Sequence, residues 1–285
     1  MRLTKLSRNL ALGLTLGSTL GLLGSASAFA ADGATARHHP KDVEFSFEGP
    51  FGTYDRGALQ RGYQVYKEVC AACHSLQFIA FRNLADKGGP EFSEAQARAL
   101  AAAVRVPAEP NEQGETVDEK GVPLTRPAVL ADKIPPPYPN ENAARANNGG
   151  SLPPDLSLMT KARMHGPHYV YSLLTGYEAS QPAELVKKFP DSKTGENMHY
   201  NPYFANLNIA MAPPLASDDM VTYSDGTKAT KDQMAQDVAA FLVWTAEPEL
   251  EKRHQTGLVW LLFMVFATVL GYMSYRNIWA EKKGH

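Results

Sequence analysis

The chain has 285 residues, of which 44% are hydrophobic and 20% charged, a composition typical of globular proteins. Residues 31–256 carry 22 Lys or Arg against 29 Asp or Glu, a formal charge of −7 within a whole-chain charge of −2. This sign excludes nucleic acid as a ligand, and it fits an acidic soluble domain as well as a surface that attracts a basic protein partner.

The first thirty residues have the pattern of a cleaved secretory signal peptide. Three basic residues lie within the first eight positions, an apolar run extends from Leu10 to Leu23, and small residues end in Ala28-Phe29-Ala30. A membrane anchor is the alternative, but it needs ~20 apolar residues, and this run is short and glycine-rich. We therefore predict that residues 1–30 are removed and that the mature chain is exported.

A helix is predicted immediately before the only two cysteines of the chain. Residues 58–69 read A-L-Q-R-G-Y-Q-V-Y-K-E-V, in which Leu59, Tyr63 and Tyr66 recur at helical spacing. The stretch V-C-A-A-C-H-S follows directly. Such a helix delivers both cysteines on one face, and its tyrosines fit ordinary core positions equally well.

Covalent haem attachment explains Cys70, Cys73 and His74 together. An exported protein normally uses a cysteine pair as a disulfide, and a C-x-x-C redox site needs an oxidoreductase context, but neither involves the adjacent histidine. Zinc needs four ligands, and no second cluster of matched spacing occurs in the sequence. In C-x-x-C-H the two thiols add to the haem vinyl groups and the histidine binds the iron. We interpret the motif as the site of one covalently bound haem c.

The middle of the chain is predicted to consist mainly of loops. Proline-rich stretches occur at residues 107–110, which read P-A-E-P, and at residues 134–139, which read I-P-P-P-Y-P. Because proline lacks a backbone N–H and fixes its own φ, such stretches interrupt helices and strands.

Met211 is the best candidate for the second axial ligand of the haem iron. It lies in N-I-A-M-A-P-P-L, where Pro213 and Pro214 stiffen the segment that follows. The histidines other than His74 lie in polar surroundings typical of surface residues, and the other methionines fit core packing or an apolar terminal segment. Ligation by histidine and methionine fills both axial positions, which is typical of an electron carrier.

The end of the exported domain is predicted to form a hairpin and a helix. Asp225-Gly226 lies between short β-prone runs and favours a small hairpin. Thr230 is a candidate N-cap for a helix that crosses the cysteine-bearing helix. Its apolar stripe consists of Met234, Val238, Phe241 and Leu242.

One transmembrane helix is predicted at residues 257–276. The run from Gly257 to Tyr275 contains no charged residue and has the ~20 residues that a bilayer span requires. Because basic residues lie on both sides of it, the orientation depends mainly on the signal peptide. We expect residues 31–256 in the periplasm and residues 277–285 in the cytoplasm. The predicted fold is mainly α, a c-type cytochrome domain with long loops, a small β-hairpin and one C-terminal transmembrane helix.

Several longer blocks resemble the cytochrome c1 family, the haem-bearing subunits of cytochrome bc1 complexes. The resemblance extends from about Phe45 to the C-terminus, and L-P-P-D-L and M-A-P-P-L are its most specific parts. The blocks read Y-Q-V-Y-K-E-V-C-A-A-C-H-S, A-A-R-A-N-N-G-G-S-L-P-P-D-L-S, Y-V-Y-S-L-L-T-G-Y and Y-N-P-Y-F-A-N-L-N-I-A-M-A-P-P-L, followed by a closing helix before a single span.

The resemblance implies a role for eight residues. Cys70 and Cys73 would form the thioether bonds, His74 and Met211 would bind the iron, Arg163 would pair with a haem propionate, and Asn148, Pro153 and Pro154 would pack against the haem. A guanidinium suits the propionate because it is always charged and matches a carboxylate in geometry.

The resemblance also implies partners and a location. The chain would take one electron from the Rieske iron-sulfur protein and pass it to a soluble or tethered cytochrome c, beside cytochrome b in a dimeric complex of the bacterial inner membrane. The alternatives are a self-standing membrane-tethered cytochrome and a haem enzyme such as a peroxidase. The first would run alone in membranes, and the second would need an open axial site.

One segment departs from the family pattern. Some members carry a cysteine after T-G-Y, or a disulfide in the insertion that follows, whereas here Glu178 follows Tyr177 and no cysteine occurs up to Asn197. We therefore expect this loop to be held without a disulfide.

Overall fold

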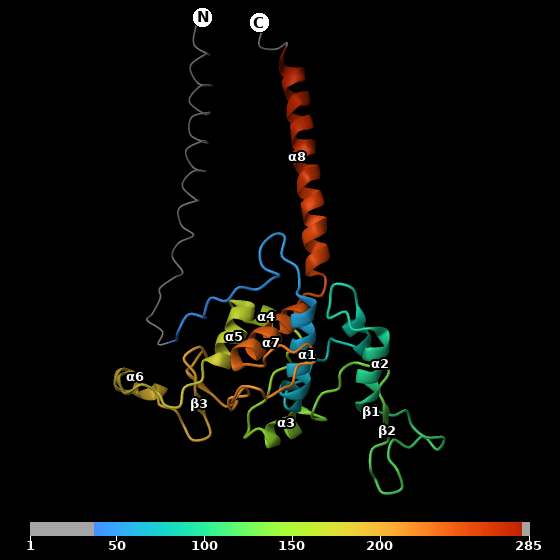
Figure 1. Ribbon diagram of the computed structural model, residues 1–285, viewed down its shortest axis with the longest axis vertical. Coiled ribbons are helices and arrows are strands. Elements are labelled where there is room, and N and C mark those ends of the chain that lie inside the picture. The colour runs from blue at the N-terminus through green and yellow to red at the C-terminus, as the bar shows by residue number, and fades with distance from the viewer. Residues whose placement is uncertain (1–36, 281–285) are drawn as a thin grey trace, which may run out of the picture. The chain divides into compact units, whose positions relative to one another are not determined.

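A computed structural model of the protein describes residues 37–280 and is mainly helical, as predicted (Figure 1). The signal peptide predicted at residues 1–30 lies outside the described residues, as does the end of the predicted tail. The α-helices are α1 (Arg56–Glu68), α2 (Glu94–Ala102), α3 (Glu141–Asn147), α4 (Met159–Ala162), α5 (Gly166–Thr175), α6 (Ala183–Lys188), α7 (Lys231–Ala246) and α8 (Leu250–Ala280). Short 3-10 helices occupy η1 (Cys70–Ala72), η2 (Phe81–Ala85) and η3 (Pro190–Ser192).

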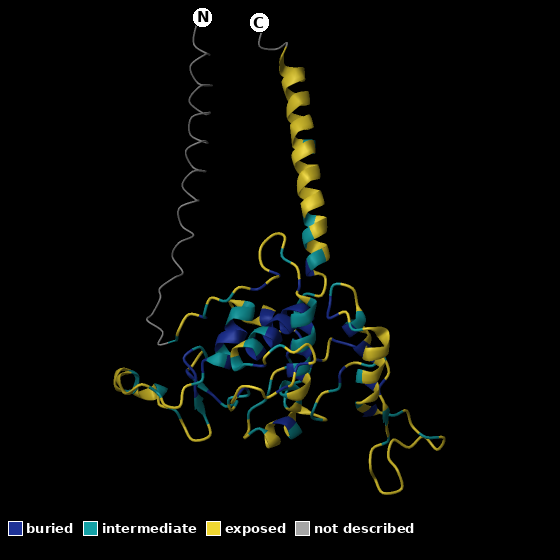
Figure 2. Cartoon of the chain, viewed as in Figure 1, coloured by how far each residue is buried: buried dark blue, intermediate teal, exposed yellow. Residues whose placement is uncertain are grey.

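The core lies where α1 and α7 pack against each other. The sequence predicted this crossing of the helix before the cysteines by the helix that follows Thr230. Thr230 is the N-cap of α7, because its hydroxyl accepts a hydrogen bond from Gln233 N at 3.1 Å. All four residues of the predicted stripe of α7 are buried. Figure 2 shows this buried centre in dark blue, with the exposed loops around it.

Gly62 allows the close approach of the two helices. A Cβ atom built at this position would lie 2.1 Å from Asp237 O and 2.6 Å from the Cβ of Phe241. Beside it, the Arg61 guanidinium holds the buried Asp237 carboxylate at 2.9 and 3.0 Å. Gly62, which has no side chain, and the Arg61–Asp237 ion pair therefore fix how α1 packs on α7. The cysteines follow directly after α1.

Two small antiparallel sheets are found among the described residues, and neither lies at the predicted position. Strand β1 (Arg105–Pro107) pairs with β2 (Thr125–Pro127), and β3 (His199–Tyr200) pairs with β4 (Asn208–Ile209). The prediction of a small hairpin is correct, but its placement at Asp225-Gly226 is wrong. Asp225 lies in a turn without flanking strands, because its carboxylate bonds Thr227 N and Arg61 instead.

The loop after Tyr177 is held by polar contacts. The side chain of Gln181 donates to Ser192 O at 2.8 Å and accepts from Thr194 N at 3.1 Å, so it closes the segment that contains α6 and η3. Asn208 of β4 also donates to Ser192 O, at 2.9 Å. The described segment is thus held by side-chain amides.

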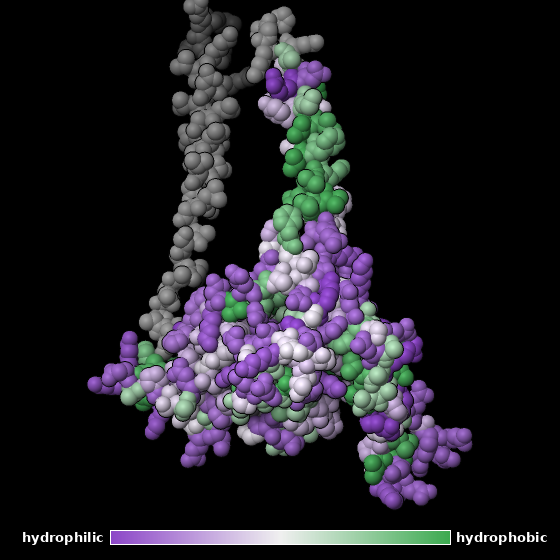
Figure 3. Space-filling view, viewed as in Figure 1, coloured by the Kyte–Doolittle hydropathy of each residue, from purple (hydrophilic) through white to green (hydrophobic). Residues whose placement is uncertain are grey.

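Helix α8 begins before the predicted span and continues beyond it. It is long and apolar enough to cross a membrane, and its apolar stretch appears in green in Figure 3. Its first turn is fastened to the domain, because Glu251 receives two hydrogen bonds from Arg56, at 2.7 and 2.8 Å, and one from Tyr54 N at 2.7 Å. The base of α8 is thus tied to the start of α1.

Candidate haem site

The cysteines lie in a tight turn after α1 rather than in the helix itself. Residue Val69 ends α1, and η1 then places Cys73 N 3.1 Å and His74 N 2.9 Å from Cys70 O. The chain therefore reverses around Cys70, which brings both thiols and the histidine to one end of α1. Both cysteines are free and half-buried.

The surroundings of the thiols disfavour the redox and zinc interpretations of C-x-x-C. Burial, and then the neighbouring Cys73, raise the pKa of the Cys70 thiol to about 12. Redox-active cysteines function as thiolates, which this environment opposes. Among residues 37–280, no group of three His, Cys, Asp or Glu side chains lies close enough to hold a metal ion.

His74 is held in the tautomer that an iron ligand requires. Its Nδ1 atom lies 2.8 Å from Pro154 O, a carbonyl that can only accept, so Nδ1 carries the proton and Nε2 keeps its lone pair. Burial lowers the pKa of His74, which favours the neutral ring. This backbone contact therefore presets Nε2 for metal coordination.

The L-P-P-D-L loop is clamped to the segment after His74 through Asp155. One oxygen of the Asp155 carboxylate accepts from Ser75 Oγ at 2.8 Å and from Gln77 N at 2.9 Å, and the other accepts from Ser157 N at 2.9 Å. Burial opposes the charge, but these hydrogen bonds outweigh it and lower the pKa of Asp155. The ionised clamp keeps the Pro154 carbonyl facing the imidazole.

Arg163 shares a hollow with this loop. A cavity of about 310 Å³ is lined by Pro154, Asp155, Phe78, Arg163 and their neighbours. The exposed guanidinium donates to Ala162 O at 3.0 Å, and no carboxylate pairs with it among the described residues. A guanidinium without a carboxylate partner, in a hollow that Pro154 also lines, suits a propionate.

Among the described residues, no hydrogen bond joins Asn148 or Pro153 to either cysteine or to the His74 ring. The Asn148 amide donates to Ala144 O at 2.7 Å and ends α3, while Pro153 is half-buried beside Pro154. Their predicted packing against the haem stays a prediction.

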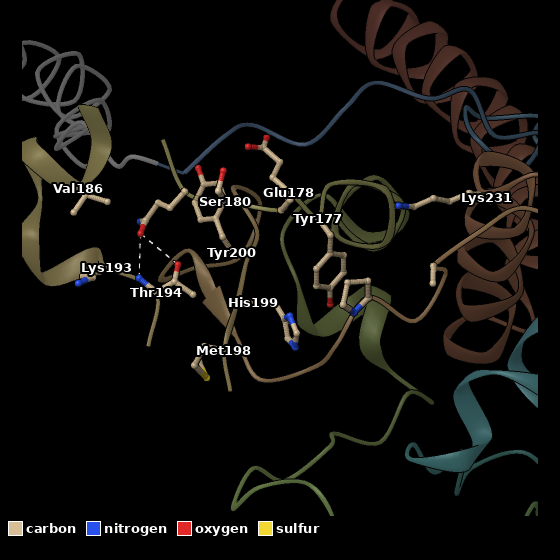
Figure 4. A pocket seen from close by; sticks show the side chains of 14 residues that line it. Tyr177, Glu178, Ser180, Val186, Lys193, Thr194, Met198, His199, Tyr200 and Lys231 are labelled. Carbon is tan, nitrogen blue, oxygen red and sulfur yellow. Dashed lines mark hydrogen bonds between the residues drawn. The ribbon is translucent and has the colours of Figure 1, made fainter. Parts of the chain in front are cut away.

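Met211 lies on a separate segment, two residues after β4. It is half-buried, and its carbonyl accepts a hydrogen bond from the Tyr177 hydroxyl at 3.0 Å. Tyr177 also lines a cavity of about 600 Å³ together with Met198, His199, Tyr200 and Pro213 (Figure 4). The segment that carries the thioether is therefore tied to the end of α5.

These donors fit a haem c group. Two adjacent thiols, an imidazole with a free Nε2, a thioether on a proline-stiffened segment and an unpaired guanidinium match the vinyl groups, iron and propionate of haem. The geometry thus brings together Cys70, Cys73, His74 and Pro154 directly, and Arg163 through the shared hollow.

Comparison with known proteins decides the family. The model of the Cytochrome C1 family matches residues 45–282. The chain belongs to the cytochrome c1 family. Membership supports a haem cofactor and electron transport by a subunit of a bc1 complex, and α8 fits a membrane-anchored member of this family.

Relatives of known name extend over most of the chain. A protein named cytochrome c1 from Rhodospirillum rubrum is 43% identical over 94% of this chain and 95% of its own length. Cytochrome c1, heme protein, mitochondrial, from Saccharomyces cerevisiae is 45% identical over 90% of this chain and 76% of its own length. Cytochrome b/c1 from Bradyrhizobium diazoefficiens is 45% identical over 85% of this chain, which spans only 36% of that protein.

Sequence patterns alone do not identify two residues that support the candidate site, Asp155 and Tyr177. Asp155 lies inside the L-P-P-D-L block, whose proline on one side and serine two residues later are the signal of a carboxylate-capped turn. Tyr177 stands at the end of T-G-Y, where nothing local indicates that its hydroxyl reaches a residue 34 positions later.

Proposed function

We propose that this chain is the electron-transfer subunit of a quinol:cytochrome c oxidoreductase, which takes one electron from the Rieske iron-sulfur protein and passes it to cytochrome c. Family membership supports the haem and the complex. The finer assignment rests on the haem site and on the acidic charge of residues 31–256.

Each site residue has a part in the proposal. Cys70 and Cys73 hold one haem c covalently, His74 and Met211 occupy the two axial positions, and Arg163 pairs with a propionate. The bound haem supplies the one-electron redox change. The observation that carries the assignment is the hydrogen bond from His74 Nδ1 to Pro154 O, because it leaves Nε2 without a proton and with a lone pair for the iron.

The proposal includes a topology. Residues 1–30 form a signal peptide, residues 31–256 the periplasmic domain, residues 257–276 the span and residues 277–285 a cytoplasmic tail of a bacterial inner-membrane protein. The name of the Bradyrhizobium relative joins b and c1 in one protein, which supports cytochrome b as a partner here. The Rieske protein, cytochrome c and the dimeric state are inferred from the family resemblance.

A native gel of membranes in mild detergent tests the assembly. We expect the covalent haem stain of this polypeptide in a large band that also contains b-type haem and an iron-sulfur protein. Migration alone, near its own mass, would instead favour the self-standing tethered cytochrome. That alternative is weakened by the size of the domain, since a free carrier needs only about half this length.

The acidic charge predicts a salt-dependent reaction with a basic cytochrome c. Between low ionic strength and ~0.15 M, where the Debye length falls to about 8 Å, we expect the bimolecular electron-transfer rate to drop at least about tenfold. Stopped-flow reduction of a basic and of an acidic cytochrome c, measured in parallel, checks this. A rate that ionic strength leaves unchanged for both acceptors would remove the electrostatic part of the proposal.

A further inference from the structure

The segment that follows β4 has little support of its own. Within the described residues, the hydrogen bond from Tyr177 is the one found to the backbone of residues 211–217. Pro213 and Pro214 have no N–H to donate, and residues 211–217 belong to no helix or strand. The position of Met211 therefore depends on its neighbours rather than on secondary structure.

Tyr177 follows a closely packed end of α5. It follows Gly176, the C-cap of α5, where a Cβ atom would lie 2.3 Å from the Tyr203 ring and 2.5 Å from Ser172 O. The absence of a side chain lets the Tyr203 ring pack directly on the end of α5. Tyr203 is fixed in turn by Asn201, whose Oδ1 accepts from Tyr203 N at 3.0 Å.

The fully buried Asn201 connects this cluster to α5. Its amide donates to Leu173 O at 2.8 Å, a carbonyl near the C-terminal end of the helix. Asn201 also belongs to the turn between β3 and β4, because its own N–H donates to Leu207 O at 2.8 Å. The end of α5, the turn and Tyr177 thus form one connected support.

The Tyr177 hydroxyl is the donor in its contact with this segment. Its oxygen lies 3.0 Å from Met211 O. Met211 O can only accept, so the direction of the bond is fixed. Tyr177 also lines the cavity of about 600 Å³, and Figure 4 shows it with His199 and Met198 among the lining side chains.

We propose that Tyr177 is a positioning residue that holds the Met211 thioether in place for the iron. The inference rests on the proposed axial role of Met211 and extends it to a residue that contacts the backbone of Met211. Without the hydroxyl, the segment 211–214 gains freedom, and the thioether leaves the iron more often. Loss of one such hydrogen bond should raise the detached population roughly two- to tenfold.

The test is Tyr177→Phe in the full chain in membranes. We expect the same yield of covalent haem, a roughly two- to tenfold faster binding of carbon monoxide to the ferrous haem, and a lower reduction potential, because detachment exposes the iron. Tyr200→Phe is the matched control. Tyr200 is buried, lines the same cavity, and its hydroxyl makes no hydrogen bond among the described residues.

Two results overturn the inference in distinguishable ways. If Met211→Leu changes the haem spectrum but Tyr177→Phe binds carbon monoxide no faster than Tyr200→Phe, Tyr177 does not position the ligand. If Met211→Leu leaves the spectrum unchanged, the axial assignment itself fails, and the role of Tyr177 fails with it. Thermal unfolding of both tyrosine variants separates a local effect from general instability, since faster binding that only matches a lower unfolding temperature also contradicts positioning.

Discussion

Replacing Met211 with leucine is expected to abolish the spectrum of a low-spin haem with two axial protein ligands. Leucine has a similar volume but no thioether, so the iron loses one ligand while the surrounding packing is kept. Methionine ligation raises the reduction potential, and changes of axial ligand span about 0.8 V among haem proteins. We therefore expect the potential of Met211→Leu to fall by a substantial part of that range, measured by redox titration of membranes.

The matched control is Met198→Leu. Met198 is also half-buried, lies 13 residues earlier and lines the cavity beside Tyr177, but it has no proposed contact with the haem. Its spectrum and potential should equal those of the unchanged protein. If Met211→Leu retains a low-spin spectrum, another residue binds the iron. If the unchanged protein already binds carbon monoxide rapidly, the haem-enzyme alternative replaces the electron carrier.

The local part of the site could be predicted from the sequence because its chemistry is contiguous. Cys70, Cys73 and His74 are adjacent in the chain, and the helix before them has a clear period. The N-cap at Thr230 and the buried stripe after it are likewise encoded within a few residues, and both are confirmed.

The remaining support could not be predicted because it joins distant residues through single atoms. Pro154 reaches His74 across 80 positions with a carbonyl, a group that every residue has. The Asp225 turn shows the same limit in reverse. Its sequence favours a hairpin, but a tertiary ion pair with Arg61 and the local bond to Thr227 N take up its carboxylate. Propensity is a weak guide wherever a partner elsewhere in the chain competes.

At Gly62, the local helix preference and the contact with a distant helix favour different residues. In an isolated helix, alanine would be favoured over glycine by about 1 kcal/mol. Here the added Cβ would lie 2.1 Å from a backbone oxygen of α7, which cannot rotate away, and the Arg61–Asp237 pair beside it resists separation of the helices. Overpacking of this kind costs about 1–3 kcal/mol and occasionally more.

We therefore expect Gly62→Ala to lower the free energy of unfolding by roughly 2 kcal/mol. We also expect a lower yield of covalent haem, because α1 leads directly into the turn that carries Cys70. Gly57→Ala on the same helix is the matched control, since its Cβ would meet only side-chain atoms of Arg61 and Asp55, both at 3.3 Å. Denaturant unfolding and haem staining of the two variants check the expectation. Equal stability in both would mean that α1 can shift on α7, and that the crossing does not fix the position of the haem motif.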